Sequence, residues 1–414
     1  MDGDWEQVAL GEVAINHDAR RVPVRESDRK PGKHPYYGAS GIVDYVDDYL
    51  FDGEYLLVAE DGENLRTRQT PIAFIAKGQF WVNNHAHILQ GSSKALTKFL
   101  HYALVSADVQ PFLTGAVMPK LTQANLHRIP LILPPKKQQE EIVGLLGSLD
   151  DKIDLNRRVA GTLEAMARAF FRSWFVDFDP VLAKAEGRPT GLPDNLAALF
   201  PDSFDPEGMP ASWRREPLFL HANLISGGTP KTDIPEYWGG GIPWASAKDV
   251  SQCTDLFLIT TERTITDAGL DNSATRLVPK MSTVVVARGA TTGRFRILGR
   301  DMAMNQTCYA LQSRNRRPFW LATAFADLVD SLVHAAHGSV FDTITTRTLE
   351  AVRVIAASDQ LMDLFEKTVG PLYRRASATC EQSRTLAALR DTLLPKLISG
   401  ELRIADAEKR IAAA

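Results

Sequence analysis

The chain has 414 residues, of which 44% are hydrophobic and 23% charged, a composition typical of a globular protein with two to three domains. It has no apolar run of the roughly 18 residues that a membrane-spanning helix needs, and its three cysteines (Cys253, Cys308 and Cys380) lack metal-ligand spacing, so we expect a reducing, cytoplasmic setting. The formal net charge of -3 argues against a chain that neutralises a long stretch of nucleic-acid phosphate by itself, because Lys and Arg make most phosphate contacts.

Residues 1–135 form the first predicted domain. Short β-rich runs broken by Gly, Asn and Asp predict strands at residues 55–58, 71–76 and 80–82. A helical pattern over residues 96–113 follows, and a last strand at 129–133 is closed by Pro134 and Pro135. The first block is therefore strand-rich with one substantial helix.

Residues 136–178 predict one long helix. Apolar or small residues recur in steps that alternate four and three, which is the 3.5-residue period of a coiled-coil seam. The members are Ile142, Leu146, Leu149, Ile153, Ala160, Leu163, Ala167, Phe170 and Trp174, with Asn156 as the polar member. Residues 179–212 follow, with six prolines and several acidic residues, and are typical of an extended connector.

Residues 213–357 predict a second domain of the same kind. Its strands are expected at residues 283–287, 295–298 and 307–311, and its helix at 319–336. Residues 358–404 predict a second long helix, and residues 405–414 a tail. Its seam positions are Phe365, Val369, Leu372, Ala376, Leu386, Leu393 and Leu397, with Thr379 in the place of Asn156.

The two long helices are similar in length and period. About 38 residues at 1.5 Å per residue make each helix roughly 55 Å long. Gly147, Gly370 and Pro371 are expected to bend or interrupt the first third of each helix. The two helices either pack on their own domains or pack against one another, and their equal length favours antiparallel packing with each other.

An internal repeat covers much of the chain. At a constant offset of 223 residues, residues 115–178 align without a gap on residues 338–401. At an offset of 222 residues, VNNHA at 82–86 aligns on MNQTC at 304–308. Closer to the start the match is loose, with YLLVAEDG at 55–62 resembling TVVVARGA at 283–290. Two copies predict an internal pseudo-two-fold repeat and, in a binding protein, a two-part target.

Several long strings in the chain resemble type I restriction-modification specificity subunits of the HsdS family. SGGTPKTDIPEYWGGGIPWASAKDV at 226–250 resembles the opening of a target recognition domain, and residues 34–62 with VNNHAHIL at 82–89 resemble a variant of it. IPLILPPKKQQEEIVGLLGSLDDKIDLN at 129–156 resembles the central helix of that family, and residues 163–204 resemble its end and connector. LAALRDTLLPKLISGELRI at 386–404 resembles the closing helix, whereas IAASDQLMDLF at 355–365 is a weaker copy of the start of the helix.

The resemblance implies an α+β protein in which two strand-rich target recognition domains are joined by two long antiparallel coiled-coil helices. Such a subunit carries no catalytic residue and directs its complex to double-stranded DNA with a bipartite, asymmetric site. The helices would space the half-sites and dock two modification subunits, which carry adenine methyltransferase chemistry and S-adenosylmethionine. Two restriction subunits, an ATP-dependent nuclease and translocase that needs Mg²⁺, would complete the complex, and this chain itself would bind no cofactor.

Candidate DNA contacts are polar or basic side chains in loops, because base edges are read by such groups from a rigid platform. Basic residues gather at 20–33 and 288–300, where they form either solvated faces or phosphate contacts. In the first domain the candidates are Lys33, His34, Tyr36, Tyr37, Ser40, Lys120 and Thr122. In the second they are Lys231, Lys248, Arg288, Thr291, Thr292, Arg294, Thr343 and Arg347. Tyr36, Tyr37 and Trp244 are also typical core aromatics.

Signs of catalysis by this chain are weak. No Asn-Pro-Pro-aromatic tetrapeptide is present, and Gly-Gly-Thr-Pro-Lys-Thr at 227–232 lacks the spacing of a phosphate loop. His85 and His87 stand two apart without a third metal ligand, and Glu60 and Asp61 lack a following Glu-x-Lys. A self-sufficient methyltransferase or nuclease is therefore disfavoured, as is a coiled-coil adaptor that binds only protein, since the strand-rich domains are long and divergent.

Overall fold

The computed structural model describes residues 5–68, 70–115, 117–335 and 343–412. Gly338 and Ala336, the first residue of the second repeat and the last of a predicted helix, lie outside the described residues. The chain divides into two compact units, one of Met1–Lys152 with Thr385–Ala414 and one of Ile153–Arg384. Both combine sheets with helices, which confirms the α+β class. No helix within the described ranges is long and apolar enough to cross a membrane.

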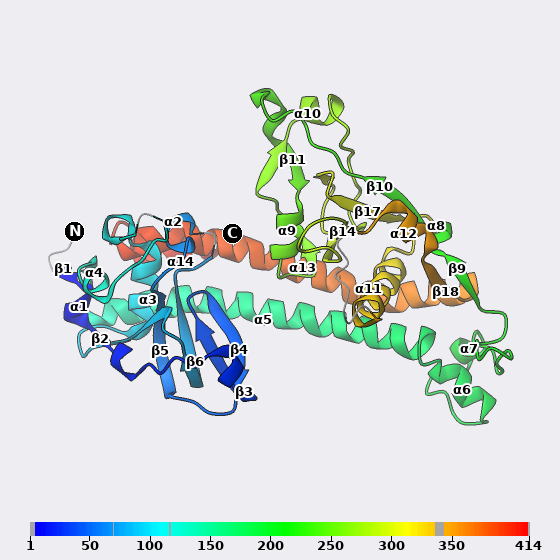
Figure 1. Cartoon of the computed structure of the whole chain (residues 1–414), viewed down its shortest axis with the longest axis horizontal. Helices are drawn as coiled ribbons and strands as arrows, with labels where there is room; N and C mark the ends of the chain where they lie inside the picture. Colours follow the sequence, from blue (N-terminus) through cyan, green and yellow to red (C-terminus); the bar gives the residue numbers. More distant parts are fainter. Residues whose placement is uncertain (1–4, 69, 116, 336–342, 413–414) are drawn as a thin grey trace. The chain divides into compact units, whose positions relative to one another are not determined.

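The first unit is built around a six-stranded sheet (Figure 1). The strands are β2 (Ala14–Asn16), β3 (Pro31–Gly38), β4 (Gly41–Val46), β5 (Phe51–Ala59), β6 (Ala73–Val82) and β7 (Ala86–Gly91). Their order is β2-β7-β5-β6-β3-β4, and all neighbours are antiparallel except β3 with β6. A separate antiparallel pair joins β1 (Glu6–Ala9) to β8 (Pro130–Leu133), so the first and last strands of the block lie together.

Short helices complete this unit: α1 (Leu10–Val13), α2 (Asn64–Thr67), α3 (Thr97–Ser106) and α4 (Gln123–His127). Helix α3 packs on β5, β6 and β7, where Phe99 and Leu100 join the buried Leu56 of β5 in one core. The predicted helix of residues 96–113 ends at Ser106, and a short 3₁₀ turn covers Gln110–Phe112. Pro111 accounts for the break, because a proline within the helix would clash with the carbonyl of the residue four positions earlier, Ala107, and could not donate to it.

The second unit contains two larger sheets. Its five-stranded sheet is formed by β10 (Ala222–Ser226), β12 (Phe257–Leu258), β14 (Thr283–Val286), β15 (Phe295–Leu298) and β17 (Cys308–Ser313), in the order β10-β17-β14-β15-β12. A three-stranded sheet has the order β13-β11-β16, with β11 at Trp238–Ala245, β13 at Arg263–Ile265 and β16 at Ala303–Met304. Strand β9 (Arg214–Pro217) pairs with β18 (Arg353–Ala356).

The helices of the second unit are α8 (Leu218–His221), α9 (Ala247–Gln252), α10 (Asp267–Asp271), α11 (Pro318–Ala335) and α12 (Thr346–Ala351). Helix α11 packs on β14 and β17, as α3 packs on β5 and β7 in the first unit. Phe319, Trp320 and Phe325 of α11 are buried in the same core as Val285 of β14. Strand β15 covers the predicted residues 295–298. Helix α11 begins at Pro318, one residue before the predicted start at residue 319.

The two units share one core topology, which confirms the predicted internal repeat. The strand order β2-β7-β5-β6 in the first unit matches β10-β17-β14-β15 in the second, and both runs are antiparallel. The parallel pairing of Tyr36 and Tyr37 in β3 with β6 is repeated by the parallel pairing of Trp244 and Ala245 in β11 with β16. The pair β9 and β18 likewise repeats the pair β1 and β8. The units differ outside this core, in β4 of the first unit and in β12 and β13 of the second.

Two helices of 40 residues each, α5 (Lys136–Phe175) and α13 (Asp359–Ile398), contribute one end to each unit. In the first unit, Ile142, Leu146 and Leu149 of α5 share a core with Leu393 and Leu397 of α13. In the second unit, the later residues Ala160, Ala167 and Phe171 of α5 share a core with Phe365 and Ala376 of α13. The helices therefore pack against one another antiparallel, as predicted.

The predicted seam is correct in outline and shifted in detail. Ile153, Asn156 and Thr379 are buried, and Leu163, Phe170, Leu372 and Leu386 are partly buried against the two cores. Phe171, Tyr373 and Cys380 are also buried, although the heptad pattern did not include them in the seam. Asn156 donates from Nδ2 to Oε1 of Gln382 on α13 (3.0 Å).

Three segments are more regular than predicted. Helices α5 and α13 continue through Gly147, Gly370 and Pro371, so the predicted interruption does not occur, and the packing of Val369 and Tyr373 into the core offsets the cost of about 3 kcal/mol for a proline within a helix. The connector of residues 179–212 is compact, with helices α6 (Asp179–Ala185) and α7 (Asp194–Ala197) and with Val181 and Phe200 buried in the core of the second unit. Most of the predicted tail forms helix α14 (Ile404–Ala412), which buries Ala407.

Candidate nucleic-acid interface

In the first unit, a turn of Asn83, Asn84 and His85 connects β6 to β7. Oδ1 of Asn83 accepts the backbone N–H of His85 (2.8 Å), the self-capping geometry that asparagine favours in turns. The backbone N–H of Asn83 donates to the carbonyl of Tyr37 at the end of β3 (2.9 Å). The turn is therefore fixed to two strands by hydrogen bonds.

Two distant segments of the chain meet this turn. The backbone N–H of Glu60, just after β5, donates to the carbonyl of His85 (2.9 Å). The backbone N–H of Leu121 in turn donates to the carbonyl of Glu60 (2.8 Å), and Asp61 forms an isolated antiparallel bridge with Lys120. Residues 60–61, 83–85 and 120–121 thus form one platform, which we call the first turn site.

Charged side chains around the first turn site are paired with one another. Arg21 Nη1 lies 2.7 Å from Glu60 Oε2, and Lys120 Nζ lies 3.2 Å from Glu60 Oε1. Burial alone would raise the pKa of Glu60, but the hydrogen bond from Arg21, the charge of His87 and the contact with Lys120 outweigh it and lower the pKa. Glu60 is therefore ionised and offsets much of the positive charge of its two neighbours.

His85 and His87 point to different partners. Nδ1 of His85 lies 2.9 Å from Asp61 at the surface, whereas Nδ1 of the buried His87 lies 2.6 Å from Asp18 and its Nε2 lies 2.7 Å from the carbonyl of Leu121. Burial raises the pKa of Asp18, but its hydrogen bond with His87 and the charge of His87 lower it further than burial raises it. Among the described residues, no group of three or more His, Cys, Asp or Glu side chains could hold a metal ion.

The second unit contains the same turn at Asn305, Gln306 and Thr307, between β16 and β17. Oδ1 of Asn305 accepts the backbone N–H of Thr307 (3.2 Å). The backbone N–H of Ala287, just after β14, donates to the carbonyl of Thr307 (2.8 Å), and the N–H of Ile344 donates to the carbonyl of Ala287 (2.8 Å). Arg288 forms an isolated bridge with Thr343, as Asp61 does with Lys120. We call residues 287–288, 305–307 and 343–344 the second turn site.

The surroundings of the second turn site differ from those of the first. Gly227 lies so close to the carbonyl of Asn305 that any side chain there would collide with it, which explains the glycine in SGGTPKT. Thr229, two residues on, donates from its hydroxyl to Oε1 of Gln306. Ala287 and Arg288 stand where the first unit has Glu60 and Asp61, so this site has an exposed cation in place of two carboxylates.

Four of the predicted DNA contacts of the first domain lie at separate places in the first unit. Lys120 belongs to the first turn site, and Ser40 follows Gly38, which approaches the side chain of Asn83. Lys33 is exposed at the start of β3. Thr122 is the N-cap of α4 and accepts the N–H of Asn125 (3.3 Å), a role that explains its residue type without DNA.

Two of the predicted contacts on β3, Tyr36 and His34, have to be corrected, whereas Tyr37 stays a predicted contact. Tyr36 is fully buried, with its hydroxyl bonded to the backbone of Val24, so its side chain reaches no surface. His34 is 8% exposed and packs against the ring of Tyr49. Tyr37 is partly buried between Phe74 and Phe80. Alternation along β3 directs the side chains of His34 and Tyr36 into the core, so Tyr36 is better explained as the core aromatic that the sequence also allowed.

In the second domain more of the candidates gather at one place. Arg288 and Thr343 belong to the second turn site, and Thr291, Thr292 and Arg294 lie in the turn that follows Arg288. Arg347 is exposed on α12, near Thr343 in the chain. Lys231 follows Thr229 and is exposed, whereas Lys248 on α9 pairs with Glu262 (2.7 Å).

Three residues at the turn sites were not predicted as contacts: Asn84, Thr229 and Gln306. Arg21 belongs to the basic group at 20–33, which was expected to form either a solvated face or phosphate contacts. A signal for two of the three was present in the sequence, since VNNHA and MNQTC align in the repeat and place Asn84 over Gln306. Both are exposed at the tips of their turns. Arg21 and Thr229 reach the turn sites because segments far apart in the sequence pair with one another, and a local sequence pattern cannot predict such pairing.

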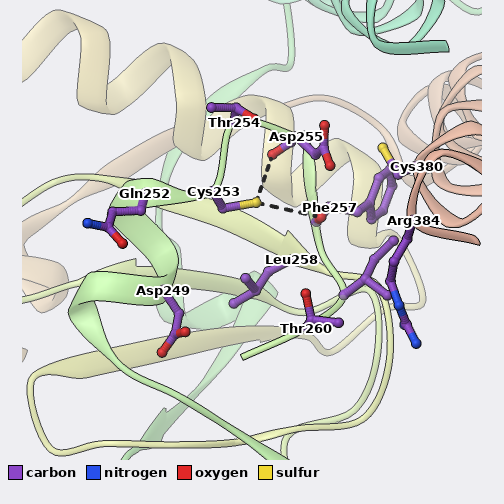
Figure 2. A pocket seen from close by; sticks show the side chains of 11 residues that line it. Asp249, Gln252, Cys253, Thr254, Asp255, Phe257, Leu258, Thr260, Cys380 and Arg384 are labelled. Atoms are coloured by element: carbon purple, nitrogen blue, oxygen red, sulfur yellow. Dashed lines mark hydrogen bonds between the residues drawn. The ribbon is translucent and has the colours of Figure 1, made fainter. Parts of the chain in front are cut away.

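A cavity of about 280 Å³ lies in the second unit, between the α9–β12 segment and α13 (Figure 2). Cys253 donates its S–H to the carbonyls of Asp255 (3.4 Å) and Phe257 (3.8 Å), and Cys380 and Arg384 line the cavity from α13. Burial raises the pKa of Cys253 and raises the pKa of Cys380 to about 11. Both thiols are protonated at neutral pH, so the cavity holds no thiolate nucleophile.

Comparisons with known proteins agree with this architecture. The family model of the type I restriction modification DNA specificity domain matches residues 2–165 and 222–355. The HindI specificity subunit of a type I restriction enzyme from Haemophilus influenzae is 24% identical, over 96% of this chain and 100% of that protein. The MjaIX specificity subunit from Methanocaldococcus jannaschii is 22% identical, over 97% of this chain and 94% of that protein.

A solved structure shows the same fold. The crystal structure of the type I restriction-modification S subunit from M. genitalium matches with a TM-score of 0.58 and 14% identity, over 96% of this chain and 97% of that one. The matched regions of the family model span both strand-rich blocks and cover most of the chain. The chain belongs to the family of type I restriction-modification specificity subunits, HsdS.

Proposed function

We propose that this chain directs a type I restriction-modification complex to a bipartite, asymmetric sequence in double-stranded DNA. Each unit reads one half of the site. The observation that carries the proposal is the presence of one core and one turn site in both units, with different side chains around each turn. A repeated platform with divergent contacts suits a target of two unlike halves.

The two long helices set the spacing of the half-sites and dock two modification subunits in this proposal. Within each unit the two helices share an apolar core, Leu146 with Leu393 in the first and Phe171 with Phe365 in the second, which supports this role as a spacer. Two restriction subunits complete the complex. With a net charge of -3, the chain relies on its partners for much of the grip on the DNA backbone.

The chain contributes recognition without catalysis. S-adenosylmethionine, ATP and Mg²⁺ act on the partner subunits, and the turn sites of this chain hold the DNA in register for them. The ion-paired Glu60 and the protonated thiols of Cys253 and Cys380 are consistent with a binding role.

The test is to express this chain with its modification subunit and to map methylated adenines across a genome by single-molecule sequencing. We expect a split, asymmetric motif. Exchange of residues 5–133 for those of a related subunit should change one half of the motif only, and exchange of residues 213–357 should change the other. A complex that assembles and methylates, but with no motif, would contradict the proposal.

A further inference from the structure

We propose that Asn84 and Gln306 are equivalent base-reading residues, one in each unit, and that each recognises the adenine of an A·T pair through its carboxamide. The inference rests on the proposed function and deepens it, because it names the side chain that reads a base in each half. The two residues align in the sequence repeat and occupy the middle of the two turn sites.

The backbone around the two residues is the same in both units. In each turn, the preceding asparagine accepts the N–H of the third residue, at 2.8 Å for Asn83 and 3.2 Å for Asn305. The carbonyl of the third residue accepts the backbone N–H of the residue just after β5 or β14, which is Glu60 at 2.9 Å and Ala287 at 2.8 Å. A geometry retained through such divergence places the middle side chain at one fixed position on the shared core.

The middle residue is exposed in both turns and carries a carboxamide in both. A carboxamide donates one hydrogen bond and accepts another in one plane, and it matches N7 and N6 of adenine in the major groove. The pairing needs a rigid platform, since a mobile side chain loses more entropy on binding. The hydrogen bonds of each turn supply such a platform.

Each site adds a group of its own. In the second unit, the hydroxyl of Thr229 donates to Oε1 of Gln306 and holds that carboxamide in one orientation. Arg288 and Arg294 are exposed beside this turn and suit contacts with phosphate. In the first unit, Arg21 and Lys120 are held at the turn by Glu60. The reader residue is shared, whereas the neighbours differ.

The experiment compares Asn84→Ala and Gln306→Ala in the assembled complex by the same methylation mapping. We expect each variant to lose discrimination at one A·T position, in opposite halves of the motif, with affinity for the cognate duplex reduced about 5- to 100-fold. Gln79→Ala and Asn272→Ala are matched controls, because they remove exposed carboxamides from the same units outside the turns. The controls should leave the motif unchanged.

Asn84→Asp keeps the size of the side chain and replaces its donor by an acceptor, so it should move the preferred base at that position from adenine towards cytosine. It also serves if Asn84→Ala does not assemble. An unchanged motif in Asn84→Asp and Gln306→Ala, with normal assembly, would overturn the inference. Failure of the proposed function is distinguishable, since the wild-type complex would then yield no motif.

Discussion

The two turn sites have the same backbone and different chemistry. In the first, Glu60 forms ion pairs with Arg21 and Lys120, and Asp61 lies within hydrogen-bond distance of His85. In the second, Ala287 and Arg288 stand at those positions, and the third residue is Thr307, whose hydroxyl donates to Oδ1 of Asn305 (2.7 Å). The hydrogen bonds that fix the turns involve backbone atoms and one asparagine, so they constrain few other side chains.

The side chains around the two turn sites differ although the backbone platform is repeated. The turn sites are held together by backbone atoms, so the side chains at these positions can differ in type. The second site has Ala287 and Arg288 in place of Glu60 and Asp61, which changes the local charge while the backbone hydrogen bonds are retained. The buried partners are less free, because Asp18 and His87 depend on one another in the first unit. We expect a substitution in this buried pair to cost more stability than a substitution at an exposed position of either turn site.

The largest effect should come from Asp18→Ala. It removes the acceptor of both His87 (2.6 Å) and the backbone N–H of Ile88 (2.8 Å) in a buried place, so we expect the first unit to lose about 3–5 kcal/mol of unfolding free energy. Urea unfolding with pulse proteolysis assigns the loss to a unit. Asp48→Ala, at an exposed aspartate, is the control. A loss below about 1 kcal/mol would show that the pair adds little stability.

Lowering the pH should affect the two units in opposite directions. Burial lowers the pKa of His101 on α3 to about 4 and raises the pKa of Glu366 on α13 to about 7. Unfolded histidine binds its proton near pH 6.5, so the contribution of His101 is present above that pH and is lost as the pH falls towards 4. The contribution of Glu366 is fully present below 4.5 and is lost as the pH rises through 7.

Between pH 6.5 and 4.5 the first unit should therefore lose stability through His101 while the second gains it through Glu366. Urea titrations at several pH values, read unit by unit, measure both slopes. His101→Leu should flatten the first slope and Glu366→Gln the second. Equal slopes in the wild-type protein and in both variants would contradict this assignment.

A smaller effect is expected on DNA binding by the assembled complex. Arg288→Ala should weaken binding about 3- to 10-fold and reduce the salt slope by about one, because it removes an exposed cation at the second turn site. Lys120→Ala should have less effect, since Glu60 already offsets that charge (3.2 Å). Titrations of a cognate duplex between 50 and 200 mM salt compare the two variants. A larger effect of Lys120→Ala would reverse the proposed difference between the sites.

The smallest effect should come from Asn83→Ala and Asn305→Ala. Each variant loses the acceptor that holds the turn, at a cost of about 1 kcal/mol. Asn305→Ala should cost slightly more, because Asn305 also accepts the hydroxyl of Thr307. Unfolding measurements on both variants test the order, and serine at either position should recover part of the loss by accepting the same N–H.

Periodicity and the repeat predicted much of the fold. The seam from Ile142 to Ile153 and the strand at residues 295–298 follow directly from local patterns. Residues 71–76 and 80–82 read as two strands, but β6 runs through Gly78, whose positive φ of 77° allows the strand to bend without ending. Pro371 lies within a helix because tertiary packing outweighs propensity, which a local pattern cannot report.

The sites were less predictable. Arg288, Thr343 and Lys120 were selected from composition and do meet the turns. Tyr36 was selected in the same way and is buried, since loop-like composition at residues 34–40 conceals strand β3. The convergence of residues 60–61 with 120–121 depends on pairing across about sixty positions, and only the structure reveals it.

The division of the chain into units has a consequence for its synthesis. The second unit is continuous, from Ile153 to Arg384, whereas the first needs Leu393 and Leu397 to cover Leu146. Strand β1 can pair only after β8 has been synthesised, because Glu6 pairs with Leu133. The part of the chain made first is therefore the last to close its core, and until residue 397 leaves the ribosome the apolar face of Ile142, Leu146 and Leu149 stays open to chaperones or to another chain.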